Sequence, residues 1–160
     1  MTEAELARFI ALETRLIDDG DYESWLGLFA DDGHYWLPIS PEQTDPVMQP
    51  CLAYEDPLLL SIRVKRLRHP QAHSQKPGSR CQHVLQASRL IETTTAGNGD
   101  ECWITRTPFT YYEHRGEQTI HLAGTATHRL IKIDGTLRIR LKRVDLLQGS
   151  TALPMIQLFP

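Results

Sequence analysis

The chain has 160 residues, of which 41% are hydrophobic and 23% are charged, and its formal net charge at pH 7 is -3. This length and composition fit one globular domain over residues 1–160, large enough to bury a substantial core. The small negative charge gives no general reason to expect a nucleic-acid partner. The N-terminal sequence is acidic, and no apolar run is long enough to span a membrane, so we expect a cytoplasmic protein without a membrane segment.

Two amphipathic helices are expected at the start of the chain. Apolar residues recur at helical spacing over residues 6–17, after a capping-box sequence at residues 2–5. Asp21 can cap a second helix, which Asp32-Gly33 would end before an aromatic strand over residues 34–38. The pattern therefore predicts two helices that lead directly into a sheet.

Prolines interrupt the segment from Pro38 to Pro57 and disfavour both a helix and a central strand there. We expect a long ordered loop, and loops of this length in compact domains are candidates for an intersubunit surface. The alternative interpretation is a mobile surface excursion. After this loop, Asp56 can cap a third helix that reaches Leu67.

One side of this third helix is basic. A basic surface can contact an acidic partner or simply remain solvated. The helix lacks aromatic side chains on which bases would stack, so we do not expect a nucleic-acid site. Its basic residues are Arg63, Lys65, Arg66 and Arg68.

The second half of the chain has the pattern of strands. The expected strands cover residues 82–95, 102–112, 119–133 and 137–147, with turns at residues 97–99, 115–116 and 134–135. Together they predict an antiparallel meander, and the preceding helices make the architecture α+β. Because Pro108 cannot donate to a strand ladder, we expect an edge position or a bulge there.

The last predicted hairpin can be assigned residue by residue. A two-residue turn at Asp134-Gly135 would put His128 opposite Leu141 on the apolar face. Lys142 would lie on the other, cationic face, and a change of apolar phase predicts a bulge near Lys142-Arg143. The tail over residues 153–159 is too apolar to remain in water, so we expect it to dock against this domain or a neighbour.

Three blocks of the chain carry a distinctive order of residues. They are LETRLIDDGDYESWLGLFADDGHYWLPIS from Leu12, the run from Tyr54 to Leu85 that contains the pattern P.SR..H, and LRIRLKRVDLLQG, which ends at Gly149. In this order they resemble the small (β) subunit of bacterial aromatic-ring-hydroxylating dioxygenases. The sequence departs from that family at Gln86-Ala87-Ser88, where the family usually has an Asn, so the resemblance does not identify the substrate.

The resemblance implies a nuclear-transport-factor-like or cystatin-like cone, in which a curved antiparallel sheet wraps around the N-terminal helices. It also implies a non-catalytic subunit that forms a trimer and joins a large (α) subunit as α3β3. A Rieske [2Fe-2S] cluster and a mononuclear non-haem iron would belong to that α partner. The holoenzyme would convert an arene and O2 into a cis-dihydrodiol. The expected subunit contacts are Arg63, Arg66, Arg68, Arg80 and Phe159.

The residues themselves argue against a redox metal in this chain. A Rieske cluster needs paired Cys and His ligands at short spacing, whereas Cys51, Cys81 and Cys102 are far apart and are expected to be buried thiols. His69 and His73 have the spacing of a metal pair, but Pro70 lies between them and the Glu of a zinc-protease motif is missing. We therefore expect no cofactor or metal site here.

The same superfold also includes enzymes like ketosteroid isomerase and scytalone dehydratase, so a stand-alone dehydratase, isomerase or small-ligand binder remains an alternative. In that case the candidates for proton transfer are Asp31, His128, Tyr35 and His83. We favour the simpler interpretation, in which both histidines are core residues with local hydrogen-bond partners. Glu13, on the apolar stripe of the first helix, is better explained as the ion-pair partner of Arg80 or Arg143.

Overall fold

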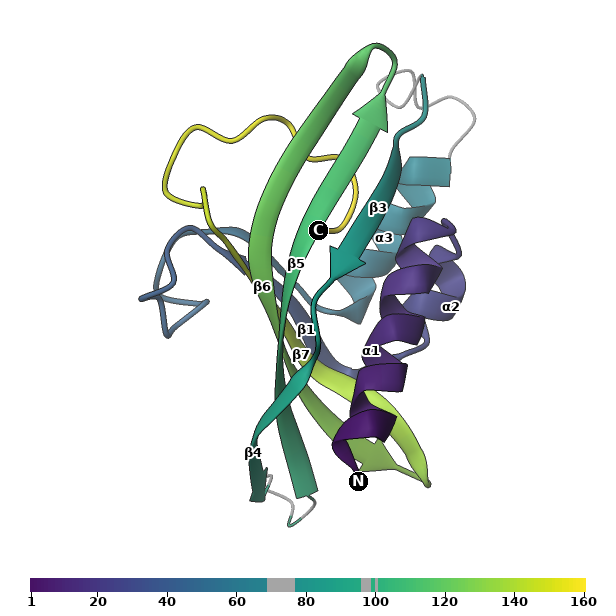
Figure 1. The fold of residues 1–160 in the computed structure, drawn as a ribbon, viewed down its shortest axis with the longest axis vertical. Helices are drawn as coiled ribbons and strands as arrows, with labels where there is room; N and C mark the ends of the chain where they lie inside the picture. Colours follow the sequence, from purple (N-terminus) through teal and green to yellow (C-terminus); the bar gives the residue numbers. More distant parts are fainter. Residues whose placement is uncertain (69–76, 96–98, 100) are drawn as a thin grey trace.

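The computed structural model describes residues 1–68, 77–95, 99 and 101–160. Its helices lie on one side of a long, twisted sheet (Figure 1). The helices are α1 (Glu3–Asp18), α2 (Tyr22–Leu26) and α3 (Pro57–Arg68). The strands are β1 (Phe29–Pro38), β2 (Cys51–Glu55), β3 (Arg80–Leu85), β4 (Arg89–Thr95), β5 (Glu101–Arg115), β6 (Gln118–Ile133) and β7 (Thr136–Leu146).

The strand order is β2-β1-β7-β6-β5-β3, and β4 also pairs with β5. Neighbouring strands are antiparallel, except that β1 runs parallel to β7. The curved sheet wraps around the helices, so the predicted α+β cone is confirmed (Figure 1). Among the described residues, no helix is long and apolar enough to cross a membrane.

The predicted capping box at the start of α1 is present, but the predicted boundary between α2 and β1 differs from the structure. The Thr2 side chain accepts from the backbone of Glu5 at 3.3 Å, and the Glu5 carboxylate accepts from the backbone of Thr2 at 2.8 Å. The predicted helix stop at Asp32-Gly33 is wrong, because both residues lie within β1. Gly33 allows β1 to approach β7, since a Cβ there would lie 2.6 Å from the carbonyl oxygen of Ile139.

The middle of the chain contains more strand than predicted. Part of the expected loop forms β2, which pairs with β1 at the edge of the sheet. Asp56 accepts from the backbone N–H of Leu59 at 2.8 Å, so the predicted cap of α3 is confirmed. The predicted strand over residues 82–95 is two strands, β3 and β4. Pro108 lies in β5 opposite the break between β3 and β4. Because neither strand pairs with β5 at this position, the missing N–H of Pro108 removes no hydrogen bond from the β3–β5 or the β4–β5 ladder.

The β6–β7 hairpin differs from the predicted register in a way that changes the cone interior. Its turn residues Asp134 and Gly135 have φ values of 49 and 79, and the predicted register holds as far as the pair of Leu130 with Ile139. The bulge then comes before the predicted position, so His128 pairs with Lys142 rather than with Leu141. One extra residue inverts the alternation of faces, and Lys142 is buried, with 3% exposure, instead of lying on the outer surface.

Two predicted features fall on residues outside the described part of the chain. They are most of the turn at residues 97–99 and the histidine pair at residues 69 and 73. The cysteines are free thiols; Cys102 is buried as predicted, whereas Cys51 and Cys81 are half-buried.

Candidate functional site: the interior of the cone

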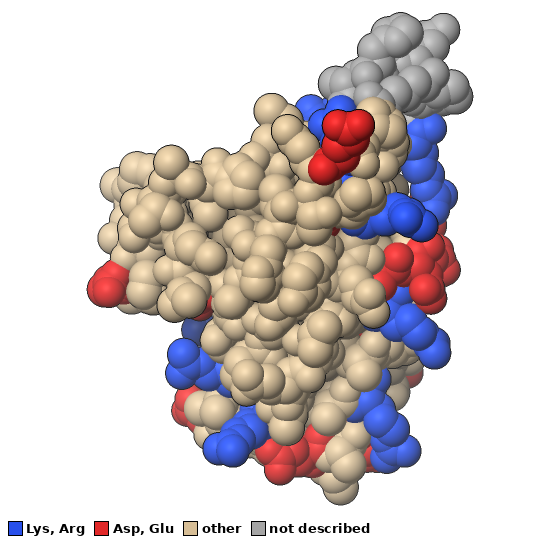
Figure 2. Space-filling view, turned by 45° about the horizontal axis from the view of Figure 1, so that its top comes forward, with Lys and Arg blue, Asp and Glu red and all other residues tan. Residues whose placement is uncertain are grey.

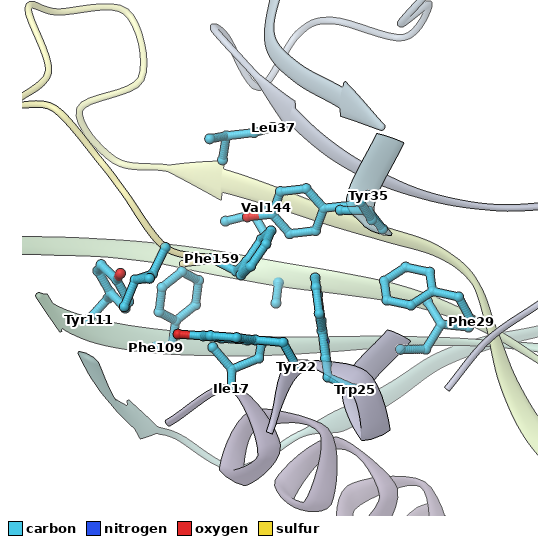
Figure 3. Close-up of a cluster of buried hydrophobic side chains, with 14 of the residues drawn as sticks. Ile17, Tyr22, Trp25, Phe29, Tyr35, Leu37, Phe109, Tyr111, Val144 and Phe159 are labelled. Carbon is cyan, nitrogen blue, oxygen red and sulfur yellow. The ribbon is translucent and has the colours of Figure 1, made fainter. Parts of the chain in front are cut away.

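The C-terminal tail folds back into the interior of the cone. Phe159 is completely buried there, between the aromatic side chains of α2 and those of the sheet (Figure 3). Its ring centroid lies 4.4 Å from that of Trp25, 5.7 Å from that of Tyr22 and 6.0 Å from that of Tyr35. The tail therefore forms part of the core, as its apolar sequence predicted.

Polar side chains bind the backbone of this tail. Glu113, only 3% exposed, accepts from the backbone N–H groups of Gln157 at 3.2 Å and Leu158 at 3.1 Å. It also accepts from the hydroxyl of Tyr111 at 2.7 Å. Tyr35 donates to the carbonyl oxygen of Pro160 at 2.9 Å. Burial raises the pKa of both tyrosines, so each hydroxyl keeps its proton and remains a donor.

Arg63, on α3, completes this set of contacts. Its guanidinium donates to the carbonyl oxygen of Leu158 at 2.8 Å, pairs with Glu55 at 3.0 Å and lies 4.4 Å from the centroid of the Phe159 ring. A guanidinium can make hydrogen bonds in its plane while its face packs on an aromatic ring. Arg63 thus joins α3, β2 and the tail within one chain.

Deeper in the cone, Glu13 is the centre of a charged group. Its Oε1 atom accepts from Nζ of Lys142 at 2.9 Å and from Nε1 of Trp25 at 2.6 Å, while Oε2 lies 3.7 Å from Nε2 of His128. Burial by itself would raise the pKa of Glu13, but the Lys142 charge, together with His128, lowers it well below its ordinary range. The predicted arginine partner of Glu13 is therefore wrong, and a lysine takes that role.

A second polar group lies where α1 meets β3. Asp18 accepts from the backbone N–H of His83 at 3.0 Å, and its other oxygen lies 2.7 Å from Nδ1 of the same residue. Cys81 donates to Asp18 at 3.7 Å. Burial raises the pKa of the Cys81 thiol to about 12, and the carboxylates of Asp18 and Glu113 act in the same direction. Asp18 therefore accepts from the thiol of Cys81 and binds the backbone N–H and Nδ1 of His83.

Little free space remains between these groups. An enclosed cavity of about 10 Å³ is bordered by Glu13, His83, His128 and Lys142, together with apolar residues and Pro160 of the tail. This volume holds about one water molecule. The Nε2 atoms of His83 and His128 are buried and have no hydrogen-bond partner among the described residues. The interior around Glu13 and His128 therefore has the donors and acceptors of an acid-base site but no room for an organic substrate. Asp18, Cys81 and His83 also border a groove of about 470 Å³ that is open to solvent.

The residues considered for proton transfer separate into two groups. His128, His83 and Tyr35 lie inside the cone, whereas Asp31 is exposed on β1. Sequence reasoning missed Asp18, Glu113 and Lys142. The inward alternation of Phe109 and Tyr111 along β5 was a signal that could have identified Glu113.

The candidate interface residues also differ in their surroundings. Phe159 and Arg63 contact each other inside one chain. Arg68 is exposed and pairs with Glu23, and Arg66 and Arg80 are exposed. Arg66 lies at the surface of α3, where it borders an open groove between β2, α3 and the tail.

Comparisons with known proteins agree with this fold. The sequence model described as "Ring hydroxylating beta subunit" matches residues 12–151. The small oxygenase component of the p-cumate 2,3-dioxygenase system of Pseudomonas putida is 30% identical over 145 residues, covering 89% of this chain and 78% of that protein.

Solved structures show the same cone. The beta subunit of the benzoate 1,2-dioxygenase from Burkholderia mallei has a TM-score of 0.71 at 22% identity, covering 98% of this chain and 96% of that one. An NTF2-like protein with a cystatin-like fold from Novosphingobium aromaticivorans has a TM-score of 0.60 at 18% identity, covering 92% of this chain and 82% of that one. These two likenesses establish the fold, and the sequence match over residues 12–151 establishes the relationship. The chain belongs to the ring-hydroxylating β-subunit family of dioxygenase systems.

Proposed function

We propose that this chain is the structural β subunit of an aromatic-ring-hydroxylating dioxygenase and has no activity of its own. The observation that carries the proposal is the filled interior of the cone: Phe159 is buried in it, and the cavity left beside Glu13 and His128 measures only about 10 Å³. An arene needs a much larger pocket, since ligand sites are typically about 300 Å³ or more. The chain therefore contributes surface and stability to an assembly in which another subunit does the chemistry.

That other subunit is a large α chain, which holds the Rieske [2Fe-2S] cluster and the mononuclear iron. The assembly is a cytoplasmic α3β3 hexamer built on a β trimer. Among the described residues, Asp18, Cys81 and His83 are the single group of three ligand-bearing side chains close enough to share a metal. The raised pKa of Cys81 opposes the thiolate form that metal binding requires. This group fits neither a Rieske centre nor a site of two histidines and one carboxylate.

Co-expression tests this function directly. The chain is produced with the α subunit encoded beside it, recognised by C-x-H and C-x-x-H cluster motifs, and the mass of the purified complex is measured. With NADH or NADPH, a reductase, any required ferredoxin and a panel of arenes that includes p-cumate and benzoate, we expect a hexamer that forms a cis-dihydrodiol. The α subunit alone is the control for assembly. Failure of the two chains to form a stable complex would refute the proposal.

One observation favours a stand-alone acid-base enzyme as the second candidate. Asp18 holds Nδ1 of His83, which leaves Nε2 facing the interior that also contains Glu13 and His128. This candidate requires the tail to leave the cone. The isolated chain is assayed with an unsaturated ketosteroid and a β-hydroxyketone, alongside the His83→Phe variant. Turnover by the wild type that His83→Phe abolishes would establish this second function, and no turnover by either protein would exclude it for these substrates.

A further inference from the structure

A groove with a mixed polar and apolar lining lies open to solvent beside α3. It measures about 730 Å³ and is formed by β2, α3 and the tail. Its exposed apolar residues are Leu52 at 45%, Leu59 at 48%, Ile62 at 54% and Met155 at 77%. Figure 2 shows a broad face with few charged side chains on the side that carries the tail. Exposed apolar side chains that line one groove are a feature of interaction sites.

The loop over residues 39–50 projects from the body of the molecule (Figure 1) and carries apolar side chains at its tip. Val47 is 76% exposed and Met48 is 80% exposed. The carboxylate of Asp45 accepts from the backbone N–H groups of both residues, at 2.9 Å and 3.0 Å. The tip is therefore held in a defined shape rather than collapsed onto the core.

Further hydrogen bonds fix the base of this loop. The buried side chain of Gln43 accepts from the backbone N–H groups of Ile39 at 2.6 Å and Ser40 at 3.1 Å. Arg143 of β7 donates to the carbonyl oxygens of Pro41 at 2.8 Å and Gln43 at 2.7 Å. A loop ordered in this way presents its tip without a large further loss of conformational entropy on binding.

The loop and the groove also have opposite charge. The loop contains Glu42 and Asp45 and no Lys or Arg. The groove is bordered by Arg63, which pairs with Glu55, and by the exposed Arg66. An acidic loop with an apolar tip is therefore complementary to a groove that offers exposed apolar side chains and the exposed charge of Arg66.

We propose that the loop tip of one copy of this chain, Val47 and Met48, binds in the β2–α3–tail groove of a second copy. The loop and the groove are different surfaces, so the contact is heterologous and can close into a ring of identical chains. This inference rests on the proposed function, which includes a β trimer, and it assigns the surfaces that hold the trimer together. Arg66 lies beside the acidic loop of the neighbouring copy in this arrangement.

Two matched variants of the isolated chain test the contact. Met48→Asp damages the tip and leaves the groove intact, while Ile62→Asp damages the groove and leaves the tip intact. Both side chains are exposed, so the fold should be retained, which circular dichroism and urea unfolding will verify. Ile91→Asp is the control, because Ile91 is 58% exposed on β4 at the opposite end of the molecule (Figure 1).

Mass measurement by analytical ultracentrifugation should find a three-chain species for the wild type and for Ile91→Asp. Each of the other two variants should be a monomer. An equimolar mixture of Met48→Asp and Ile62→Asp should form a two-chain species, because the intact tip of one fits the intact groove of the other. Such complementation is expected of a heterologous contact and not of a symmetric one.

Three results would overturn the inference: a monomeric wild type, variants that still form the three-chain species, or a mixture without a two-chain species. If the wild type is monomeric and the variants instead lose binding to the α subunit, these surfaces belong to the α contact. Binding of the wild type to the α subunit is measured separately. If the wild type does not bind the α subunit, the proposed function is wrong. If Met48→Asp still forms the three-chain species, only the proposed contact is wrong.

Discussion

The Glu13 carboxylate and the Lys142 ammonium lie 2.9 Å apart inside the cone, although 129 positions separate them in the sequence. Both side chains are nearly fully buried, with exposures of 1% and 4%. The pair connects α1 to β7, and both charges are shielded from bulk solvent. Each residue therefore depends on the other, and the pair must be tested as a unit.

Lys142→Met should strongly destabilise the protein, because it leaves the Glu13 charge buried without its cation. We expect a loss of about 3–5 kcal/mol in the free energy of unfolding, measured by urea denaturation. The double variant Glu13→Gln with Lys142→Met should lose less, since no charge remains and the Trp25 indole keeps an acceptor. Arg140→Met, which breaks an exposed pair with Asp32, is the control and should cost about 0–1 kcal/mol. Equal losses from Lys142→Met and Arg140→Met would contradict this account.

Glu13 should also make stability depend on pH in a defined direction. Although burial opposes ionisation, Lys142 and His128 lower the pKa of Glu13 in the folded chain below its ordinary value of 4.5. The unfolded chain therefore takes up this proton first as the pH falls, and stability is lost progressively below pH 4.5. From about pH 5 to about pH 3, the free energy of unfolding should fall more steeply for the wild type than for the double variant. Parallel curves would exclude Glu13 as a source of acid sensitivity.

Glu113→Ala should loosen the C-terminal tail. The substitution leaves the backbone N–H groups of Gln157 and Leu158 without this acceptor, at a cost of about 1–3 kcal/mol for the buried group of Leu158 and less for the half-buried group of Gln157. Hydrogen exchange measured by mass spectrometry should become faster in peptides that cover residues 153–160. Glu113→Gln keeps a carbonyl acceptor and should have a smaller effect, and Glu117→Ala on the exposed β5–β6 turn should have none. Unchanged exchange in Glu113→Ala would mean that ring packing and the hydrogen bonds from Arg63 and Tyr35 are enough to hold the tail.

Phe159→Ala should both destabilise the chain and open the cone. Removal of a fully buried aromatic ring costs about 3–5 kcal/mol and leaves a cavity. An apolar cavity of this kind can bind benzene, which should raise the Tm of the variant and not that of the wild type. Met155→Ala is the control, because that side chain is 77% exposed and its loss should change stability by about 0.5 kcal/mol or less. A benzene-dependent rise in the wild-type Tm would show that the native cone already has space for a ligand.

Local features of the sequence predicted the ends of several elements correctly. The capping box at Thr2 and Glu5, the Asp56 cap and the Asp134-Gly135 turn all form as expected. Each depends on hydrogen bonds or backbone angles within a few residues, so the sequence contains the whole cause. The short strand β2 and the parallel pairing of β1 with β7 involve distant segments, and the local pattern did not indicate them.

The cone interior was predicted less completely than the fold. His83, His128 and Tyr35 were identified by their residue types, and all three lie inside. Lys142 was assigned to the wrong face because the bulge in β7 comes earlier than the apolar pattern suggested. A strand alternates with a period of two, so one inserted residue exchanges the inner and outer positions beyond it.

The sequence by itself determined the α+β class, the capped helices, the final hairpin and the need to cover an apolar tail, because these follow from periodicity and local hydrogen bonding. Tertiary structure alone decided that the tail covers itself within its own cone, where Glu113 and Arg63 bind it. It also decided that Lys142, rather than an arginine, neutralises Glu13. Such partners come from segments far apart in the chain, and the curvature and register of the sheet bring them together.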